Sequence, residues 1–343
     1  MGATQGMNRR DFALTVTMAA AATCGRAMAA QKTGGEVKPG LYSITYLGVW
    51  YRGDALTLEQ VISRAKHYGY QGVEIDGKRP HGNPLDMPRK RCQELRKYAD
   101  GQGIEIYAVA GNNDFSSPMP ESREAQLLYF RELIRMTADL GAKTLRVFLA
   151  WPGVTMRLEG GARYDLAKGV WEFAHKEFSP EQTWDWCRAG LKEVAEYAGD
   201  AGVTLALQNH APVIKDYRDV LRMIREVGSP YLKACFDTRL EYGKKGEYLL
   251  RATREFGPLQ VLSHYGDEYS KVNGKIVPKE DEFLADQVAG LMEIGYRGYL
   301  GYELCHPLDP IDGQLPGIDY VDKQVQLAAE YLHEKIAEVK EVS

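Results

Sequence analysis

Four stretches of the sequence share one pattern of residues. They are HYGYQGVEI at 67–75, LGAKTLRVF at 140–148, AGVTLALQ at 201–208 and IGYRGYLGYE at 294–303. In each, a glycine that can end a helix is followed by a short run of aliphatic or aromatic residues typical of a buried strand. This repeated order of helix, glycine and strand predicts alternating helices and strands, which build a parallel sheet.

The same pattern extends over most of the chain. We predict eight strands, at 41–46, 71–75, 104–110, 144–149, 203–208, 232–237, 260–263 and 298–303. Helices are expected to begin near Thr57, Met87, Ser122, Pro180, Asp216, Gly246, Asp281 and Ile318. Eight strand–helix units favour a single (β/α)8 TIM barrel, which we assign to residues 40–340. The long connection at 151–180, after the fourth strand, is expected at the catalytic face.

The first 29 residues resemble a twin-arginine export signal. Arg9 and Arg10 precede a short apolar run that extends to Thr23, and the triplet at 27–29 has small residues at both ends. The run is too short to span a bilayer. We therefore expect a periplasmic or otherwise exported protein without membrane association after signal removal, with residues 30–39 as a linker.

Composition excludes several classes of protein. The chain has 343 residues, of which 44% are hydrophobic and 26% charged, as in soluble globular proteins. Removing residues 1–29 changes the net charge from -4 to -6 (40 minus 46), so no basic nucleic-acid surface is expected. The sequence allows a homo-oligomer. Four cysteines remain, and we expect mostly buried free thiols because such signals export folded proteins. They are Cys92, Cys187, Cys235 and Cys305.

Metal-binding side chains lie at the ends of four successive predicted strands. Strands five to eight end in Gln208, Asp237, His264 and Glu303. The carboxyl ends of the strands carry the chemistry in a TIM barrel, so these groups are expected to converge. A mixed set of oxygen and nitrogen donors suits Mn²⁺, Mg²⁺, Co²⁺ or Zn²⁺. The sequence therefore predicts one divalent metal, of a kind that the donors do not distinguish.

These strand ends also resemble a known family. LALQNH at 205–210, ACFDT at 234–238, VLSHYGD at 261–267 and GYLGYELCHP at 298–307 are similar to motifs of the xylose-isomerase-like sugar isomerases and epimerases. The resemblance covers about residues 40–340. It implies a divalent metal held by a Glu, an Asp, a His and a Glu, at the four positions named above.

Two positions depart from the family pattern. The strand-five glutamate, which also acts as a base in the family's epimerases, is Gln208 here. A histidine common three residues after the strand-six aspartate is Leu240, beside Arg239. Because a glutamine amide cannot accept a proton at ordinary pH, two-base epimerisation does not carry over directly.

The remaining strand-end residues are assigned roles by chemistry. Glu303 is the predicted base. His210 is predicted to be either a second acid or base or a partner that orients a ligand, and Glu74 is predicted to act as an acid or base or to bind a substrate hydroxyl. Asp267 is expected to orient His264. The predicted substrate-binding residues, some of which could equally be rim packing, are Trp50, Asn113, Arg146, Trp151, Arg239, Tyr265 and His306.

Three functions remain open from the sequence. The first is a metal-dependent isomerase or epimerase that abstracts a proton next to the carbonyl of a non-phosphorylated sugar or keto-sugar. The second is a lyase that cleaves 3-keto-glycosides by β-elimination, which needs one base. The third is a non-catalytic periplasmic sugar-binding barrel. In each case the expected partner is a small carbohydrate.

Overall fold

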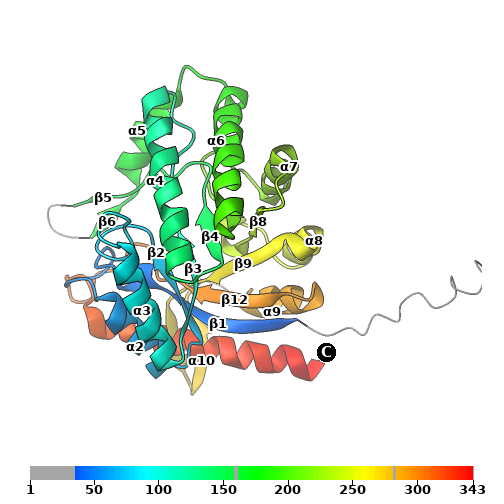
Figure 1. The fold of residues 1–343 in the computed structure, drawn as a ribbon. Coiled ribbons are helices and arrows are strands. Elements are labelled where there is room, and N and C mark those ends of the chain that lie inside the picture. The colour runs from blue at the N-terminus through cyan, green and yellow to red at the C-terminus, as the bar shows by residue number, and fades with distance from the viewer. Residues whose placement is uncertain (1–34, 158–160, 281–282, 343) are drawn as a thin grey trace, which may run out of the picture. The chain divides into compact units, whose positions relative to one another are not determined.

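The protein, described by a computed structural model, contains a closed barrel of eight parallel strands (Figure 1). The structure describes residues 35–157, 161–280 and 283–342, so the predicted signal at 1–29 lies outside the described residues. The strand order around the barrel is β1-β12-β9-β8-β7-β4-β3-β2. These strands are β1 (Glu36–Tyr42), β2 (Gly72–Asp76), β3 (Glu105–Ala110), β4 (Thr144–Val147), β7 (Thr204–Gln208), β8 (Leu232–Cys235), β9 (Gln260–Tyr265) and β12 (Arg297–Tyr302). The predicted (β/α)8 fold is confirmed.

A helix follows each barrel strand, as predicted. These helices are α2 (Leu58–His67), α3 (Arg89–Gln102), α4 (Pro120–Asp139), α6 (Pro180–Ala201), α7 (Tyr217–Val227), α8 (Glu247–Phe256), α9 (Leu284–Glu293) and α10 (Ile318–Val342). Two of them begin with a capping box, in which Thr57 pairs with Gln60 and Ser179 with Gln182. Gly202 ends α6 in the left-handed conformation (φ 67°) that glycine adopts without strain. Local sequence therefore sets where these helices start and stop.

The first strand differs from the prediction. We expected a strand at 41–46, but β1 covers Glu36–Tyr42 and residues Ser43–Tyr46 form a 3-10 turn. Pro39 and Gly40 argue against a strand when read locally. Pairing with β12 nevertheless makes this segment a strand, because β1 aligns with β12 from Glu36 opposite Arg297 to Leu41 opposite Tyr302. The barrel thus begins inside the segment that we assigned to a linker.

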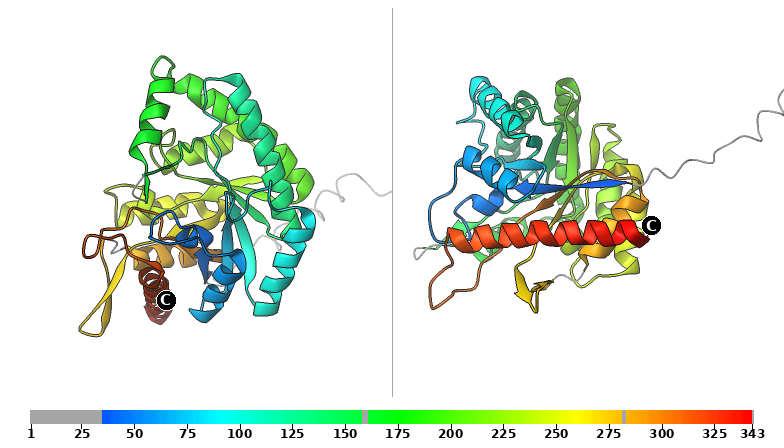
Figure 2. Two further views of the ribbon diagram at one scale, coloured as in Figure 1. Left: turned by 90° about the vertical axis from the view of Figure 1, so that its left-hand side faces the viewer. Right: turned by 90° about the horizontal axis from the view of Figure 1, so that it is seen from below.

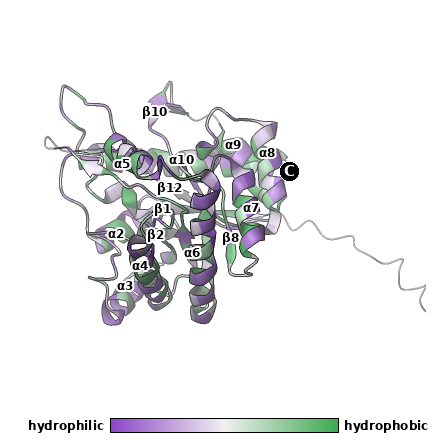
Figure 3. Ribbon diagram, turned by 90° about the horizontal axis from the view of Figure 1, so that it is seen from above, coloured by the Kyte–Doolittle hydropathy of each residue, from purple (hydrophilic) through white to green (hydrophobic). Residues whose placement is uncertain are grey.

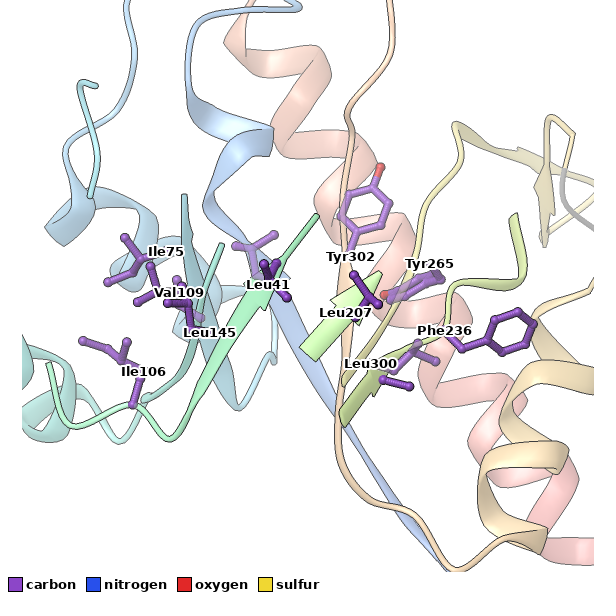
Figure 4. Packing of buried hydrophobic residues seen from close by; sticks show 14 of the residues in the cluster. Leu41, Ile75, Ile106, Val109, Leu145, Leu207, Phe236, Tyr265, Leu300 and Tyr302 are labelled. Carbon is purple, nitrogen blue, oxygen red and sulfur yellow. The ribbon is translucent and has the colours of Figure 1, made fainter. Parts of the chain in front are cut away.

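Alternate residues of each strand face two different hydrophobic layers. Leu41, Ile75, Leu207 and Leu300 belong to the large cluster that includes the helices, and Figure 4 shows this layer. Ala206, Cys235 and Leu262 belong to a second, smaller cluster together with Tyr107 and Tyr299. Because Ala234 and Phe236 flank Cys235 and lie in the first cluster, the second cluster fills the barrel interior. The surrounding helices carry both hydrophilic and hydrophobic stretches (Figure 3).

Two stacked tyrosines fill the interior below the strand ends. The rings of Tyr107 and Tyr299 lie 4.2 Å apart at 9°. Glycines on neighbouring strands make room for them. A Cβ on Gly72 would lie 2.6 Å from Cε1 of Tyr299, and one on Gly40 would lie 2.7 Å from the hydroxyl of Tyr107. Glycine is required at both positions because the tyrosine side chains approach the backbone too closely for a Cβ atom.

Two connections are longer than a simple turn. The segment after β4 holds the short pair β5 (Thr155–Met156) and β6 (Ala162–Arg163), followed by α5 (Asp165–His175), a helix that the sequence analysis missed. The segment after β9 holds the hairpin β10 (Tyr269–Val272) and β11 (Lys275–Pro278), drawn in yellow away from the barrel in Figure 2. Both insertions follow the carboxyl ends of strands.

The four cysteines of the barrel are free thiols, as predicted. Cys92, Cys187 and Cys235 are buried and Cys305 is half-buried. Over the described ranges, no helix has the length and apolar character needed to cross a membrane.

Gly72→Ala is expected to lower the free energy of unfolding by at least about 2 kcal/mol, because its Cβ would overlap two tyrosine rings and the Glu105 carbonyl. Gly101→Ala is the control, because Gly101 lies on α3 with open space around it, and this change should raise stability by up to about 1 kcal/mol. Urea denaturation measures both. Equal effects of the two substitutions would contradict the proposed packing of the interior.

Candidate functional site

A cavity of about 620 Å³ opens at the carboxyl ends of the barrel strands. Its walls include side chains from β1, β2, β4, β7 and β9 and from the segments that follow β3, β8 and β12. The residues most relevant to chemistry are Tyr42, Asp76, Lys78, Asn112, Arg146, Phe148, Trp151, Tyr164, Lys168, Gln208, His210, Asp237, Arg239, His264, Glu303 and His306. Its volume is within the range of sites that enclose small molecules. Trp151, Tyr164 and Lys168 show that the long segment after β4 forms part of the wall.

Three of the four predicted metal ligands form one hydrogen-bonded group. Gln208 donates from its amide nitrogen to Oδ2 of Asp237. Nδ1 of His264 lies 3.0 Å from the same oxygen, and the His264 backbone N–H donates to Oδ1 at 2.6 Å. The fourth, Glu303, is the more accessible group, with 21% of its side chain exposed. The structure therefore brings Gln208, Asp237 and His264 together, while Glu303 lines the same cavity outside the group of ligand atoms that lie within 4.8 Å of one another.

Beneath this group lies a buried pair of opposite charges. Nε of Arg146 lies 3.0 Å from Oε1 of Glu74, and Nη1 lies 3.9 Å from Oε2 of Glu303. The guanidinium also lies 4.4 Å from the centre of the Tyr42 ring. Burial opposes the charge of Arg146, but the carboxylates of Glu74 and Glu303 together with Tyr42 outweigh it and raise its pKa. Arg146 is therefore a permanent cation inside the barrel mouth.

Glu74 connects this cation to the histidine. Its Oε2 accepts a hydrogen bond from Nε2 of His264 at 2.5 Å. Burial alone would lower the pKa of His264, but the carboxylates of Glu74 and Asp237 outweigh it and raise the pKa well above its usual value. Burial likewise opposes the charge of Asp237, and its contact with His264 lowers the pKa of this carboxyl. The two carboxylates thus hold the imidazole in one orientation.

The donor atoms fit a divalent metal. A bound ion would replace the proton on Nδ1 of His264 while Nε2 still donates to Glu74, which is the usual arrangement of a carboxylate behind a metal-bound histidine. Oε1 of Gln208 is buried and accepts no hydrogen bond from any described residue. Turning the Gln208 amide by half a rotation would exchange Nε2 and Oε1 and direct the oxygen at Asp237. Gln208, Asp237, His264 and Glu303 would then hold the ion.

Cys235 lies in the same cluster but is a poorer ligand. Its sulfur lies 3.6 Å from Nδ1 of His264, and ligand atoms of Cys235, Asp237 and His264 lie within 4.8 Å of one another. Burial raises the pKa of the Cys235 thiol to about 12, so it keeps its proton. A metal ligand must be the thiolate. Cys235 therefore packs beside the donor group.

Glu74 does not face the cavity, contrary to its predicted contact with substrate. It is fully buried and its oxygens are directed at His264 and Arg146. Glu74 also occupies the position that we assigned to Asp267, since it is the carboxylate on the far nitrogen of His264. Asp267 instead accepts hydrogen bonds from the backbone N–H groups of Glu268 and Glu280.

The predicted substrate-binding residues separate into two groups. Arg146, Trp151, Arg239 and His306 line the cavity. Three others are buried and turn their polar groups elsewhere.

Trp50 is 2% exposed and does not line the cavity. The amide of Asn113 is bonded to the backbone of Phe148, at 2.8 Å from its nitrogen and 3.1 Å from its oxygen. Tyr265 borders the cavity, but its hydroxyl donates to the Ala328 carbonyl on α10. In a strand in which His264 faces inward, the next side chain must face outward.

His210 has one nitrogen available to a ligand. Its Nδ1 lies 2.5 Å from the Ala211 carbonyl, so this nitrogen carries the proton and Nε2 is the acceptor. The ring meets Phe148 and Trp151 edge-on, with centroids 5.2 and 4.9 Å away. Loss of solvent lowers the pKa of His210 to about 4. His210 is therefore neutral at pH 7 and presents Nε2 as a proton acceptor.

The sequence analysis assigned no role to several residues of the wall. Asp76 accepts hydrogen bonds from the hydroxyl of Tyr42 and from Asn112, and Lys78 lies 3.9 Å away. The rings of Phe148 and Tyr164 form an aromatic wall together with Trp151. The ring centre of Trp151 lies 5.7 Å from that of Phe148 and 5.9 Å from that of Tyr164. Asp76 ends a predicted strand, so its position was the available signal. Tyr42 was not recognised as the end of a strand, because the first strand was predicted at 41–46 whereas β1 ends at Tyr42.

Comparison with known proteins identifies the family. Residues 62–324 match the family model of the xylose isomerase-like TIM barrel, and the chain belongs to this family. It is 24% identical to fructoselysine 3-epimerase of Escherichia coli O157:H7 over 257 residues, which are 73% of this chain and 86% of the relative.

Solved structures have the same fold. The structure of D-psicose 3-epimerase with D-fructose is similar with a TM-score of 0.65 and 16% identity, covering 88% of this chain and 99% of that one. The structure of 3-keto-D-glucoside 4-epimerase from E. coli is similar with a TM-score of 0.61 and 17% identity, covering 89% and 99%.

Glu74→Gln is expected to lower the free energy of unfolding by about 3–5 kcal/mol, because Arg146 would remain buried without its nearest carboxylate. Glu59→Gln is the matched control, because it removes a half-exposed ion pair with Arg91 and should cost less than about 1 kcal/mol. Chemical denaturation measures both values. A loss below 1 kcal/mol for Glu74→Gln would show that the buried network does not depend on this charge.

Proposed function

We propose that the protein is an enzyme of the isomerase or epimerase type, which removes a proton next to the carbonyl of a sugar or keto-sugar. The observation that carries the proposal is the convergence of Glu303, a partly exposed carboxylate, with Gln208, Asp237 and His264 in one cavity. The 3-epimerase activity named for the E. coli relative supports the reaction class. The predicted export signal favours non-phosphorylated substrates.

In this proposal Glu303 is the base. Its carboxylate lines the cavity and can accept the proton from the carbon next to the carbonyl. The cationic guanidinium of Arg146 lies 3.9 Å away and can orient Glu303. A divalent metal held by Gln208, Asp237, His264 and Glu303 would polarise the carbonyl and stabilise negative charge on its oxygen. The aromatic wall of Phe148, Trp151 and Tyr164 gives a sugar ring apolar faces to contact.

The second proton-transfer group distinguishes epimerisation from elimination. Gln208 cannot accept a proton, so epimerisation requires another group, and Nε2 of His210 is the available acceptor in the wall.

The second candidate function, β-elimination of a 3-keto-glycoside, requires only Glu303 as base. The electron pair of the C2–H bond becomes the C1=C2 double bond, while the C1–O bond breaks and the aglycone leaves with its oxygen and takes up a proton. The glutamine at position 208 favours this candidate over a two-base reaction.

Glu303→Gln is expected to reduce solvent exchange at the carbon next to the carbonyl by about 10²–10⁴-fold, because the base is lost. The assay incubates fructose, psicose and a 3-keto-glucoside in D₂O and follows deuterium by NMR. Glu247→Gln, an exposed change on α8, should leave the rate unaltered. Exchange that survives Glu303→Gln would remove Glu303 as the base. If the wild-type protein exchanges no keto-sugar, the binding role is favoured.

His210→Gln separates the two reactions. For two-base epimerisation, this variant should form no inverted product, because the second acceptor is lost. For β-elimination, release of the aglycone from a 3-keto-glucoside should continue within a few-fold of the wild-type rate. Product analysis by NMR distinguishes C2 deuteration without cleavage from aglycone release.

Elemental analysis is expected to find one divalent metal per chain after supplementation with Mn²⁺, Co²⁺ or Zn²⁺. Asp237→Asn should lose it, because it removes the central carboxylate of the donor group. Asp216→Asn, at the cap of α7, is the control that should retain it. A wild-type protein without metal, or an Asp237→Asn variant with full metal content, would reject the metal-dependent form of the proposal.

A further inference from the structure

We infer that the substrate carries an anionic group and that Arg239 binds it. This inference rests on the proposed function, because it names the substrate class of the same cavity. Arg239 lies in the short turn η2 (Thr238–Leu240), directly after Asp237. It is half-buried and lines the cavity with Asp237, His264 and Glu303.

Arg239 differs from the other cations of the wall in having no carboxylate. Arg146 faces Glu74 and Glu303, Lys78 lies 3.9 Å from Asp76, and Lys168 lies 3.7 Å from Glu172. Arg239 makes neither an ion pair nor a hydrogen bond with any residue that the structure describes. A half-buried guanidinium loses part of its hydration, and without a carboxylate partner this cost is not offset by an ion pair. A bound oxyanion would supply the missing interaction.

The carboxylates of the wall are already engaged. Asp76 accepts from Tyr42 and Asn112, Asp237 accepts from Gln208 and His264, and Glu303 faces Arg146. The described wall contains four cationic side chains (Lys78, Arg146, Lys168 and Arg239) and three carboxylates (Asp76, Asp237 and Glu303). Because Glu74 and Glu172 pair with Arg146 and Lys168 from outside the wall, Arg239 is the cation of the described wall that has no carboxylate partner. A divalent metal at the donor group would increase the attraction for an anion.

The fold holds this guanidinium at a defined place. Its Nη1 would lie 2.6 Å from a Cβ built on Gly266, so the missing side chain of that glycine leaves space for it between the ends of β9 and β12. In the strand order, β12 lies across the barrel from β4, and Phe148 and Trp151 follow the end of β4. These aromatic rings therefore lie on the opposite side of the cavity from Arg239, whereas Arg146 on β4 and Lys168 on α5 lie on the aromatic side and already have carboxylate partners.

This division fits a sugar that bears an acidic group. The ring would contact the aromatic wall, and the acidic group would meet Arg239. The planar fork of a guanidinium matches a carboxylate with two parallel hydrogen bonds, and it also binds phosphate. The shared chemistry is an oxyanion, and the predicted export signal favours the carboxylate of a sugar acid.

The test compares matched ligands by calorimetry. Glucose, glucuronate and glucose 6-phosphate, and the corresponding set from galactose, are titrated into the full chain and into Arg239→Gln. We expect an anion to bind roughly tenfold to a hundredfold more tightly than its neutral partner, and Arg239→Gln to remove this preference. Preference for the uronate would identify a sugar acid, and preference for the phosphate a sugar phosphate. Arg251→Gln, an exposed change on α8, should keep the wild-type preference.

Two results would overturn the inference. One is the absence of any preference for an anion across both sets, and the other is a preference that survives Arg239→Gln. Deuterium exchange with neutral keto-sugars is measured in parallel. If neutral sugars exchange and anions show no advantage, the proposed function stands and the anionic substrate is rejected. If Arg239→Gln slows exchange of neutral sugars without changing anion binding, Arg239 instead acts on the reacting group.

Discussion

The site depends on how buried charges compensate one another at the mouth of the barrel. Glu74, Arg146, Asp237 and His264 are almost completely removed from water. Each would be costly alone, because an isolated charge in the interior loses its hydration. Arranged as alternating acids and bases, they stabilise one another, and each side chain is held in one orientation. Glu303, at the edge of this network, is left partly exposed to meet a ligand.

The same network explains why inward-facing residues differ along the length of the barrel. Below it, Tyr107 and Tyr299 fill the interior against glycines, and the hydroxyl of Tyr299 donates to the carboxylate of Glu105. Above it, aromatic and cationic side chains form the cavity wall. The packed interior and the polar network are thus separated along the strands. This separation is the usual division of a TIM barrel into a stable end and a catalytic end.

Much of the site was predictable because strand ends are visible in the sequence. Gln208, Asp237 and Glu303 each end a predicted strand and His264 directly follows one, and the barrel brings such ends to one rim. The errors have a common cause. The role of Glu74 was misjudged because its depth below the rim, two residues before the end of β2, is not apparent from residue type. Tyr265 was misjudged because strand alternation turns it away from His264, and Asn113 because its amide is used by the backbone of Phe148.

The sequence by itself determined the repeated strand–helix order and the set of polar strand ends. These follow from local rules, since helix caps, terminal glycines and buried runs act over a few residues. Only the tertiary structure decided which groups compensate one another. Glu74 meets His264 190 positions later, and Arg146 lies between Glu74 and Glu303. The absence of a carboxylate beside Arg239 is likewise a result of the tertiary structure. Pairing between strands distant in the chain depends on closure of the barrel, and no local pattern encodes it.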